Sequence, residues 1–143
     1  MLPVSGAEQL KASGQGVGGA LRSAFLSVIS PMSLVTIGAD GRILGRHRKL
    51  VPTWAEKLTW ANGDASSMRV HDTTIGPLGA LACGENTNTL ARFSLLSQGE
   101  LVHVASYIAL PVAPKDYDMA EAIRLRAAAH CFEGKVFTVV ACS

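Results

Sequence analysis

The chain has 143 residues, of which 48% are hydrophobic and 17% charged, and these proportions exclude a disordered or fibrous protein. The formal net charge is +2 and comes from interspersed Lys and Arg, so we expect no nucleic-acid partner and no anionic membrane surface as a partner. The three cysteines do not have the spacing of a metal or redox motif, so we expect reduced thiols. No apolar run approaches the roughly 20 residues that span a bilayer, and we predict a cytoplasmic protein.

The composition of the chain changes after Pro31. Residues 1–32 are rich in Gly, Ser and Ala without a clear period, so we treat them as a poorly specified segment before one domain at 33–143. The stretches SLVTI and RILGRH around the turn GADG predict a hairpin. Residues 50–64 then predict a long structured loop with one helical turn at 54–58, and a short strand is expected at 68–71.

Strands and helices alternate in the rest of the sequence. The apolar run PLGALAC, at 77–83, predicts a strand buried on both faces. A helix is expected at 87–98, with Asn86 or Thr87 as its cap, and its apolar residues would form a core or interface stripe: Leu90, Phe93 and Leu95 or Leu96. LVHVAS predicts the next strand.

A second helix and a last strand complete this pattern. Asp118 and Glu121 resemble a capping box for a helix that ends near Phe132, with Gly134 just beyond it, and KVFTVVA predicts a strand. The order of strand, helix, strand, helix and strand favours an α/β fold in which helices cover a sheet.

Cys83 is the first candidate for chemistry. It lies where the predicted buried strand meets the polar run CGENTNT, which opens a helix whose N-terminus would favour a thiolate. On composition alone, a buried thiol that only packs is the more common outcome. Cys131 and Cys142 are interpreted as packing residues, and His103 and His130 as core or supporting residues, so no metal or cofactor is predicted.

The second candidate is the segment HRKLVPTWAEKLTW, which carries Lys49 and Glu56. A cation and a carboxylate on a loop at the end of a sheet suit acyl transfer, because the cation stabilises developing negative charge and the carboxylate orients it or relays protons. The alternative is an exposed strand end with a surface ion pair.

Three strings in order decide between these alternatives: HRKLVPT, CGENTNTL and the stretch from IRLRAAAH to the C-terminus. From about Ser33 to Ser143 the chain resembles the nitrilase branch of the carbon-nitrogen hydrolase superfamily. The resemblance implies an α-β-β-α sandwich, here in partial form. It also implies that Cys83 is the nucleophile, Lys49 the catalytic lysine and Glu56 an additional glutamate, while the N–H of Gly84 helps to bind developing charge.

This resemblance predicts hydrolysis of a small-molecule nitrile to a carboxylic acid and ammonia, in a homo-oligomer. Cyanide hydration or dihydration would use the same residues. The family's first glutamate lies in an FPE-type motif upstream, and nothing in residues 1–32 matches it, since Glu8 stands in the context GAEQL. A truncated, non-catalytic chain that acts only by assembling with itself or with a full-length relative is therefore the alternative from a different class.

Overall fold

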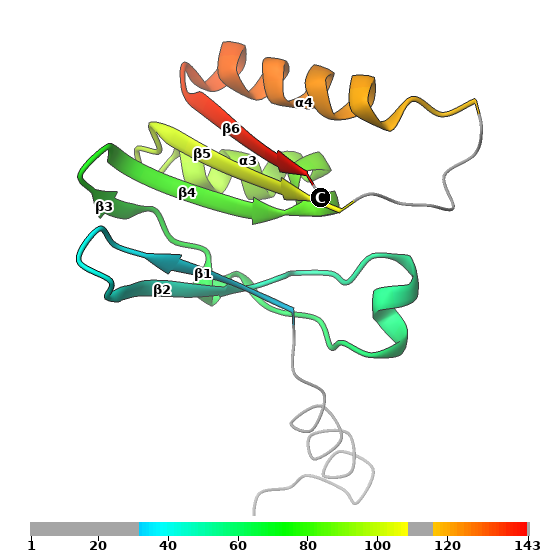
Figure 1. Ribbon diagram of the computed structural model, residues 1–143, viewed down its shortest axis with the longest axis horizontal. Coiled ribbons are helices and arrows are strands. Elements are labelled where there is room, and N and C mark those ends of the chain that lie inside the picture. Colours follow the sequence, from blue (N-terminus) through cyan, green and yellow to red (C-terminus); the bar gives the residue numbers. More distant parts are fainter. Residues whose placement is uncertain (1–31, 109–115, 143) are drawn as a thin grey trace, which may run out of the picture.

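The computed structural model describes residues 32–108 and 116–142, which form a two-stranded sheet, a four-stranded sheet and two α-helices (Figure 1). The segment predicted for residues 1–32 lies outside the described residues, apart from Met32. The strands are β1 (Ser33–Ile37), β2 (Ile43–Arg48), β3 (His71–Thr73), β4 (Gly76–Ala82), β5 (Val102–Tyr107) and β6 (Phe137–Cys142). The helices are α3 (Thr89–Leu96) and α4 (Met119–Gly134), with 3-10 turns η1 (Trp54–Leu58), η2 (Ala65–Ser67) and η3 (Cys83–Thr87).

The predicted hairpin is confirmed. Strands β1 and β2 pair antiparallel, with Ser33 opposite Arg48. Between them the N–H of Gly41 donates to the carbonyl of Gly38 over 2.9 Å. Gly41 has φ +81°, a left-handed conformation that favours glycine and explains the Asp-Gly pair in the turn.

The larger sheet has the order β3-β4-β5-β6. Strand β3 is antiparallel to β4, whereas β4, β5 and β6 are parallel, as α3 and α4 between them require. The alternation of strand and helix predicted from the sequence is confirmed. Leu81 of β4 lies opposite Ala105 of β5, which lies opposite Val140 of β6, so these residues share one face.

Both helices cover that shared face. Leu81 packs with Ala91 and Leu95 of α3, and Ala105 packs with Ile123 of α4. The hairpin lies on the other side of the larger sheet (Figure 1), where Gly45 of β2 approaches the ring of His71. The result is a helix layer, a sheet and a second sheet, which is the partial form of the α-β-β-α sandwich that was predicted.

Several details differ from the predictions. The short strand lies at His71–Thr73 instead of 68–71, because Met68 ends η2 and is buried. Helix α3 is capped by Asn88, whose side chain accepts the N–H groups of Leu90 and Ala91. Leu90 and Phe93 are 78% and 64% exposed, so the predicted core stripe is wrong for these two residues, and an interface role remains a prediction.

The second helix extends further than predicted. Asp118 caps α4 by accepting the N–H of Glu121 over 2.9 Å, whereas the Glu121 side chain binds Arg124. The helix includes Gly134, and Lys135 takes the left-handed position at φ +56°. Cys131 is half-buried but Cys142 is exposed, so the packing role predicted for Cys142 is wrong in the described structure. Neither helix within 32–108 or 116–142 combines the length and apolar character that a bilayer-spanning segment needs.

Candidate active site

Cys83 lies at the junction between β4 and η3. The strand ends at Ala82, one residue earlier than predicted, and Cys83 takes the left-handed conformation with φ +50°. A non-glycine residue in this region is strained and needs support from its surroundings. The side chain is 9% exposed and packs with Ala105, Tyr107 and Ile123. Tyr107 in this cluster is also buried, and burial raises the pKa of its hydroxyl.

Lys49 follows the last residue of β2 and is almost fully buried, with 1% of its side chain exposed. Its Nζ donates to Oε2 of Glu56 over 2.6 Å. Glu56 Oε2 also accepts the backbone N–H of Thr53, which fixes the carboxylate on η1. A buried ammonium needs such a partner, because removing one member would leave an uncompensated charge away from water. The surface ion pair considered as the alternative is therefore excluded for Lys49.

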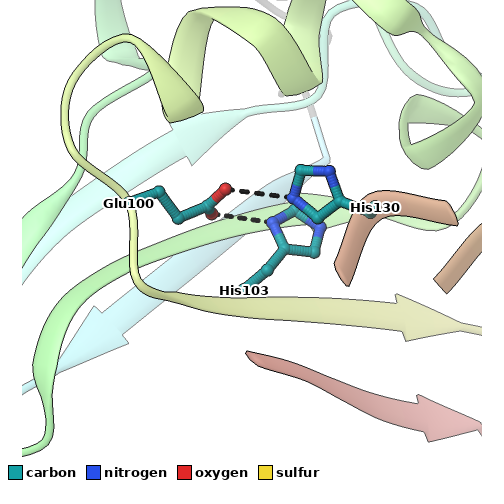
Figure 2. A group of neighbouring side chains, drawn as sticks. All are labelled: Glu100, His103 and His130. Atoms are coloured by element: carbon teal, nitrogen blue, oxygen red, sulfur yellow. Dashed lines mark hydrogen bonds and ion pairs between the residues drawn. The ribbon is translucent and has the colours of Figure 1, made fainter. Parts of the chain in front are cut away.

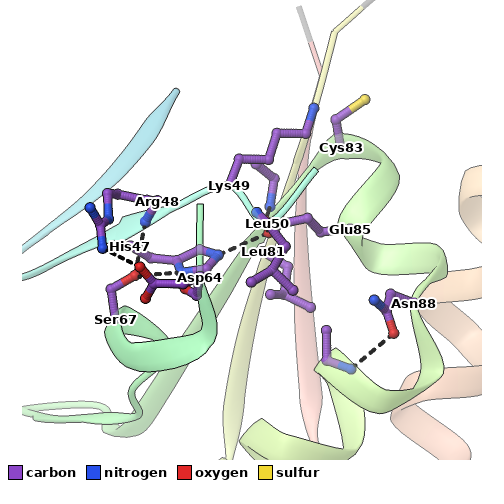
Figure 3. Close-up of polar contacts among 12 residues, drawn as sticks. His47, Arg48, Lys49, Leu50, Asp64, Ser67, Leu81, Cys83, Glu85 and Asn88 are labelled. Atoms are coloured by element: carbon purple, nitrogen blue, oxygen red, sulfur yellow. Dashed lines mark hydrogen bonds and ion pairs between the residues drawn. The ribbon is translucent and has the colours of Figure 1, made fainter. Parts of the chain in front are cut away.

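The backbone of Lys49 is held on both sides. Its N–H donates to the carbonyl of Met32, and its carbonyl accepts the N–H of Gly63, both over 2.8 Å. A Cβ on Gly63 would approach the Lys49 carbonyl to 2.6 Å, so only glycine allows this contact without displacement. Figure 3 shows the Lys49 and Cys83 side chains extending to the same side, from the ends of two strands that lie in different sheets.

Glu85 connects these two strand ends and was not predicted from the sequence. Its Oε1 accepts the N–H of Leu50 over 2.7 Å and lies 3.0 Å from Nε2 of His47. Its Oε2 accepts the N–H of Ala82 over 2.9 Å. One buried carboxylate thus links the residues beside Lys49 to the residue before Cys83 (Figure 3). Glu85 therefore joins the end of β2 to the end of β4.

The charge of Glu85 is stabilised by its partners. Burial by itself raises the pKa of this carboxyl, but the hydrogen bonds from His47, Ala82 and Leu50 outweigh burial and lower it. His47 in turn has Nδ1 3.3 Å from the hydroxyl of Ser67, which also accepts the N–H of Arg48. The end of β2 is therefore embedded in a polar network that is largely shielded from water.

Gly84, predicted to bind developing charge through its N–H, lies next to the loop that carries Glu56. A Cβ on Gly84 would lie 3.1 Å from Oγ1 of Thr53. An open hollow of about 380 Å³ lies between this loop and η3, with Pro52, Thr53, Trp54 and Gly84 among its lining residues. Neither Cys83 nor Lys49 lines this hollow, so the charge-binding role of Gly84 remains a prediction.

A second buried cluster contains Glu100, His103 and His130 (Figure 2). Glu100 Oε1 lies 2.7 Å from His103 Nδ1, and Glu100 Oε2 lies 3.1 Å from His130 Nε2. These ligand-type atoms all lie within 4.8 Å of one another, a spacing that would also admit a metal ion. The two short contacts have the lengths of hydrogen bonds, and we interpret the cluster as hydrogen-bonded rather than as a set of metal ligands.

The layered fold, with a cysteine at a strand end and a buried lysine–glutamate pair, places the chain in the class of carbon-nitrogen hydrolases. The profile of the Carbon-nitrogen hydrolase family matches residues 27–143, and the chain belongs to this family.

Two curated relatives are similar to this chain. A protein named Nitrilase 3, from an unknown prokaryotic organism, is 37% identical over 101 residues, which cover 71% of this chain and 30% of the relative. A protein named Nitrilase, from Paraburkholderia phymatum, is 37% identical over 100 residues, which cover 70% of this chain and 28% of the relative. The chain thus spans less than a third of the length of these relatives.

A solved structure with a similar fold is an amidase variant from Nesterenkonia sp. AN1, described with acrylamide added at its active-site cysteine. It superposes with a TM-score of 0.67 at 13% identity, over 78% of this chain and 42% of the amidase. This likeness confirms the fold.

Proposed function

We propose that the chain supplies the nucleophile and the cationic group of a nitrilase, which hydrolyses an organic nitrile to a carboxylic acid and ammonia. The observation that carries the proposal is the contact of buried Lys49 with Glu56 at 2.6 Å, beside a strand end that Glu85 links to the turn of Cys83. The family and the curated relatives named nitrilases support the choice of a nitrile as substrate.

The first half of the reaction forms a covalent intermediate. The Cys83 thiolate attacks the nitrile carbon, a C–S bond forms, and one electron pair of the triple bond moves to nitrogen, which takes a proton to give a thioimidate. Water then adds to the same carbon and ammonia leaves, so the intermediate becomes a thioester. A second water releases the carboxylic acid and restores the thiol, for a total of two waters consumed.

Lys49 serves the step in which negative charge develops on nitrogen. A cation fixed in a poorly hydrated site stabilises such charge more strongly than one in water and does not need to reorganise during the reaction. Glu56 keeps the ammonium oriented and compensates its charge before substrate binds. In this scheme Cys83 and Lys49 touch the reacting atoms, whereas Glu56 and Glu85 act by positioning.

The alternative is a non-catalytic chain that assembles with itself or with a full-length relative. By resemblance, the base that takes the thiol proton is a glutamate in an FPE-type motif, and a general base of this kind contributes on the order of 10²–10⁴ in rate. Cyanide dihydration with the same cysteine consumes two waters and differs only in substrate, whereas cyanide hydration consumes one water and releases the amide, with no loss of ammonia.

The proposal is tested by measuring which cysteine reacts. Iodoacetamide should alkylate Cys83 faster than Cys131 or the exposed Cys142, read out by peptide mass spectrometry. Lys49→Ala should slow the reaction of Cys83 at least fivefold, because the neighbouring cation is lost, whereas the exposed control Lys57→Ala should not. Equal alkylation of all three cysteines, in a chain shown to be folded, would remove Cys83 from the nucleophile role.

A further inference from the structure

His103 makes a close polar contact with each of its two ring nitrogens. It lies on β5 with 2% of its side chain exposed. Its Nδ1 is 2.7 Å from Oε1 of Glu100, and its Nε2 is 2.8 Å from Oδ1 of Asn86. Which of these nitrogens carry protons follows from what the two partners can donate or accept.

Asn86 can present only its carbonyl oxygen to His103. Its amide nitrogen donates to the backbone carbonyls of Leu81 and Cys83, each over 3.1 Å. Turning the amide around would set its oxygen against two carbonyl oxygens and would lose both hydrogen bonds. Nε2 of His103 therefore carries a proton, which it donates to Asn86.

Glu100 demands a second proton on the same ring. Each carboxyl oxygen faces a ring nitrogen, Oε1 that of His103 at 2.7 Å and Oε2 that of His130 at 3.1 Å, and we take the group as a carboxylate that accepts from both. Burial raises the pKa of this carboxyl, and the hydrogen bonds from the two rings lower it below its ordinary value. A neutral His103 with its proton on Nε2 would place a lone pair 2.7 Å from this carboxylate oxygen. Nδ1 must therefore also donate.

We propose that His103 is a buried imidazolium, held by Glu100, and that it acts as a positioning residue for Cys83 through Asn86. The proposal rests on Cys83 being the nucleophile. The chain of contacts runs from Glu100 through His103 and Asn86 to the carbonyls of Leu81 and Cys83, on either side of the turn. Cys83 has a left-handed φ of +50°, and these bonds supply the support that such a conformation needs.

The surroundings of His103 include further charged and titratable groups. Helix α3 contributes Arg92 and helix α4 contributes Arg126 and His130, which together with Tyr107 of β5 line a water-sized cavity of about 10 Å³ beside the ring. The arginines oppose a charge on His103. Arg92 is 3.9 Å from Glu133, whereas Glu100 is buried and its Oε1 lies 2.7 Å from Nδ1 of His103.

Gly79 is part of the same arrangement. It lies opposite His103 in the sheet, and a Cβ at this position would lie 2.0 Å from Oε1 of Glu100. The absence of a side chain on β4 leaves the space in which the Glu100 carboxylate reaches His103. A glycine at this position of β4 therefore allows the contact between Glu100 and His103.

The protonation state is tested on the full chain labelled with ¹⁵N-histidine. Two-bond ¹H–¹⁵N spectra at pH 7 should show both ring nitrogens of His103 protonated. Glu100→Gln should convert His103 to the neutral ring with its proton on Nε2, because the amide of Gln can donate to Nδ1. A neutral His103 in the unsubstituted chain would overturn the proposal, and this measurement needs no variant to fold.

The link to Cys83 is tested by alkylation, with exposed Cys142 as internal reference. Asn86→Ala should slow alkylation of Cys83 at least fivefold relative to Cys142, because the turn loses both anchors. Asn88→Ala, two residues away, removes a helix cap but no contact with the turn, and the ratio should stay within twofold. An unchanged ratio in Asn86→Ala would refute the positioning role.

These outcomes separate the two proposals. If Cys83 in the unsubstituted chain reacts no faster than Cys142, the nucleophile assignment fails whatever the spectra show. If Cys83 reacts fast but His103 is neutral, the proposed function stands and the imidazolium is refuted.

Discussion

Replacing Glu85 by glutamine removes the charge that joins the two strand ends while preserving the shape of the side chain. The carboxylate has three donors around it, with His47 and Leu50 at one oxygen and Ala82 at the other. If the glutamine keeps its oxygen beside His47 and Leu50, its NH₂ group points at the N–H of Ala82. One hydrogen bond is then lost, and two buried donors face each other.

The expected cost follows from those contacts. A hydrogen bond to a charged group contributes about 1.5–3 kcal/mol, and leaving a buried donor without an acceptor costs about 1–3 kcal/mol. Because the neighbours relax partly, we expect Glu85→Gln to lower the free energy of unfolding by about 3 kcal/mol. For a domain near 100 residues this corresponds to a fall of roughly 12–24 °C in melting temperature.

The assay is thermal and urea unfolding of the full chain, with Glu121→Gln as the matched control. Glu121 is an exposed glutamate whose pairing with Arg124 is a surface ion pair, so the control should lose less than about 1 kcal/mol. If Glu85→Gln unfolds within 0.5 kcal/mol of the unsubstituted chain, roughly the scatter of surface substitutions, the positioning role of Glu85 is wrong.

Three further predictions concern stability. The folded-state pKa values of Glu85 and Glu100 lie below the ordinary value near 4.5. Their contribution to the free energy of unfolding is therefore fully present above that value and is lost as pH falls through the lower folded values. Urea unfolding should show this fall in the free energy of unfolding in acid, and the fall should be smaller in Glu85→Gln. Gly79→Ala should cost about 2 kcal/mol or more by displacing Glu100, and an unchanged unfolding midpoint would contradict this. Asp118→Ala should cost about 1 kcal/mol through loss of the α4 cap, measured by circular dichroism melting, and no change would show that the cap is dispensable.

The order of elements was predictable because it depends on local patterns. The Asp-Gly turn, the apolar run before Cys83 and the cap at Asp118 are each written within a few consecutive residues. The exposure of Leu90 and Phe93 was not predictable in the same way. Helical spacing identifies an apolar stripe but does not say which of its residues the sheet covers, and here Ala91 and Leu95 face the core.

The candidate residues of the site were predictable from the sequence, but the residue that joins the two strand ends was not. Lys49 and Glu56 are seven residues apart on one loop, and the structure brings them into contact. Glu85 was missed because its partners lie 35 residues away at Leu50 and three residues back at Ala82. A sequence signal existed, since a carboxylate directly after a buried strand must find donors, but the sequence does not say where those donors are.

His103 and Glu100 were missed as a pair for a similar reason. Their spacing of three residues is visible in the sequence, but His130 and Asn86 come to them only through the packing of α4 and η3 against the sheet. Buried polar groups are satisfied by tertiary contacts, and these contacts depend on the register of strands that are distant in sequence. The interpretation of both histidines as core or supporting residues agrees with their burial.

Ammonia release tests the central claim most directly. The purified chain would be incubated with aromatic, arylacetic and aliphatic nitriles and with cyanide, beside its Cys83→Ala variant and a Cys142→Ala control. The account predicts ammonia release that is lost in Cys83→Ala and retained in Cys142→Ala. No release from a chain that is folded, or release that persists without Cys83, would contradict it.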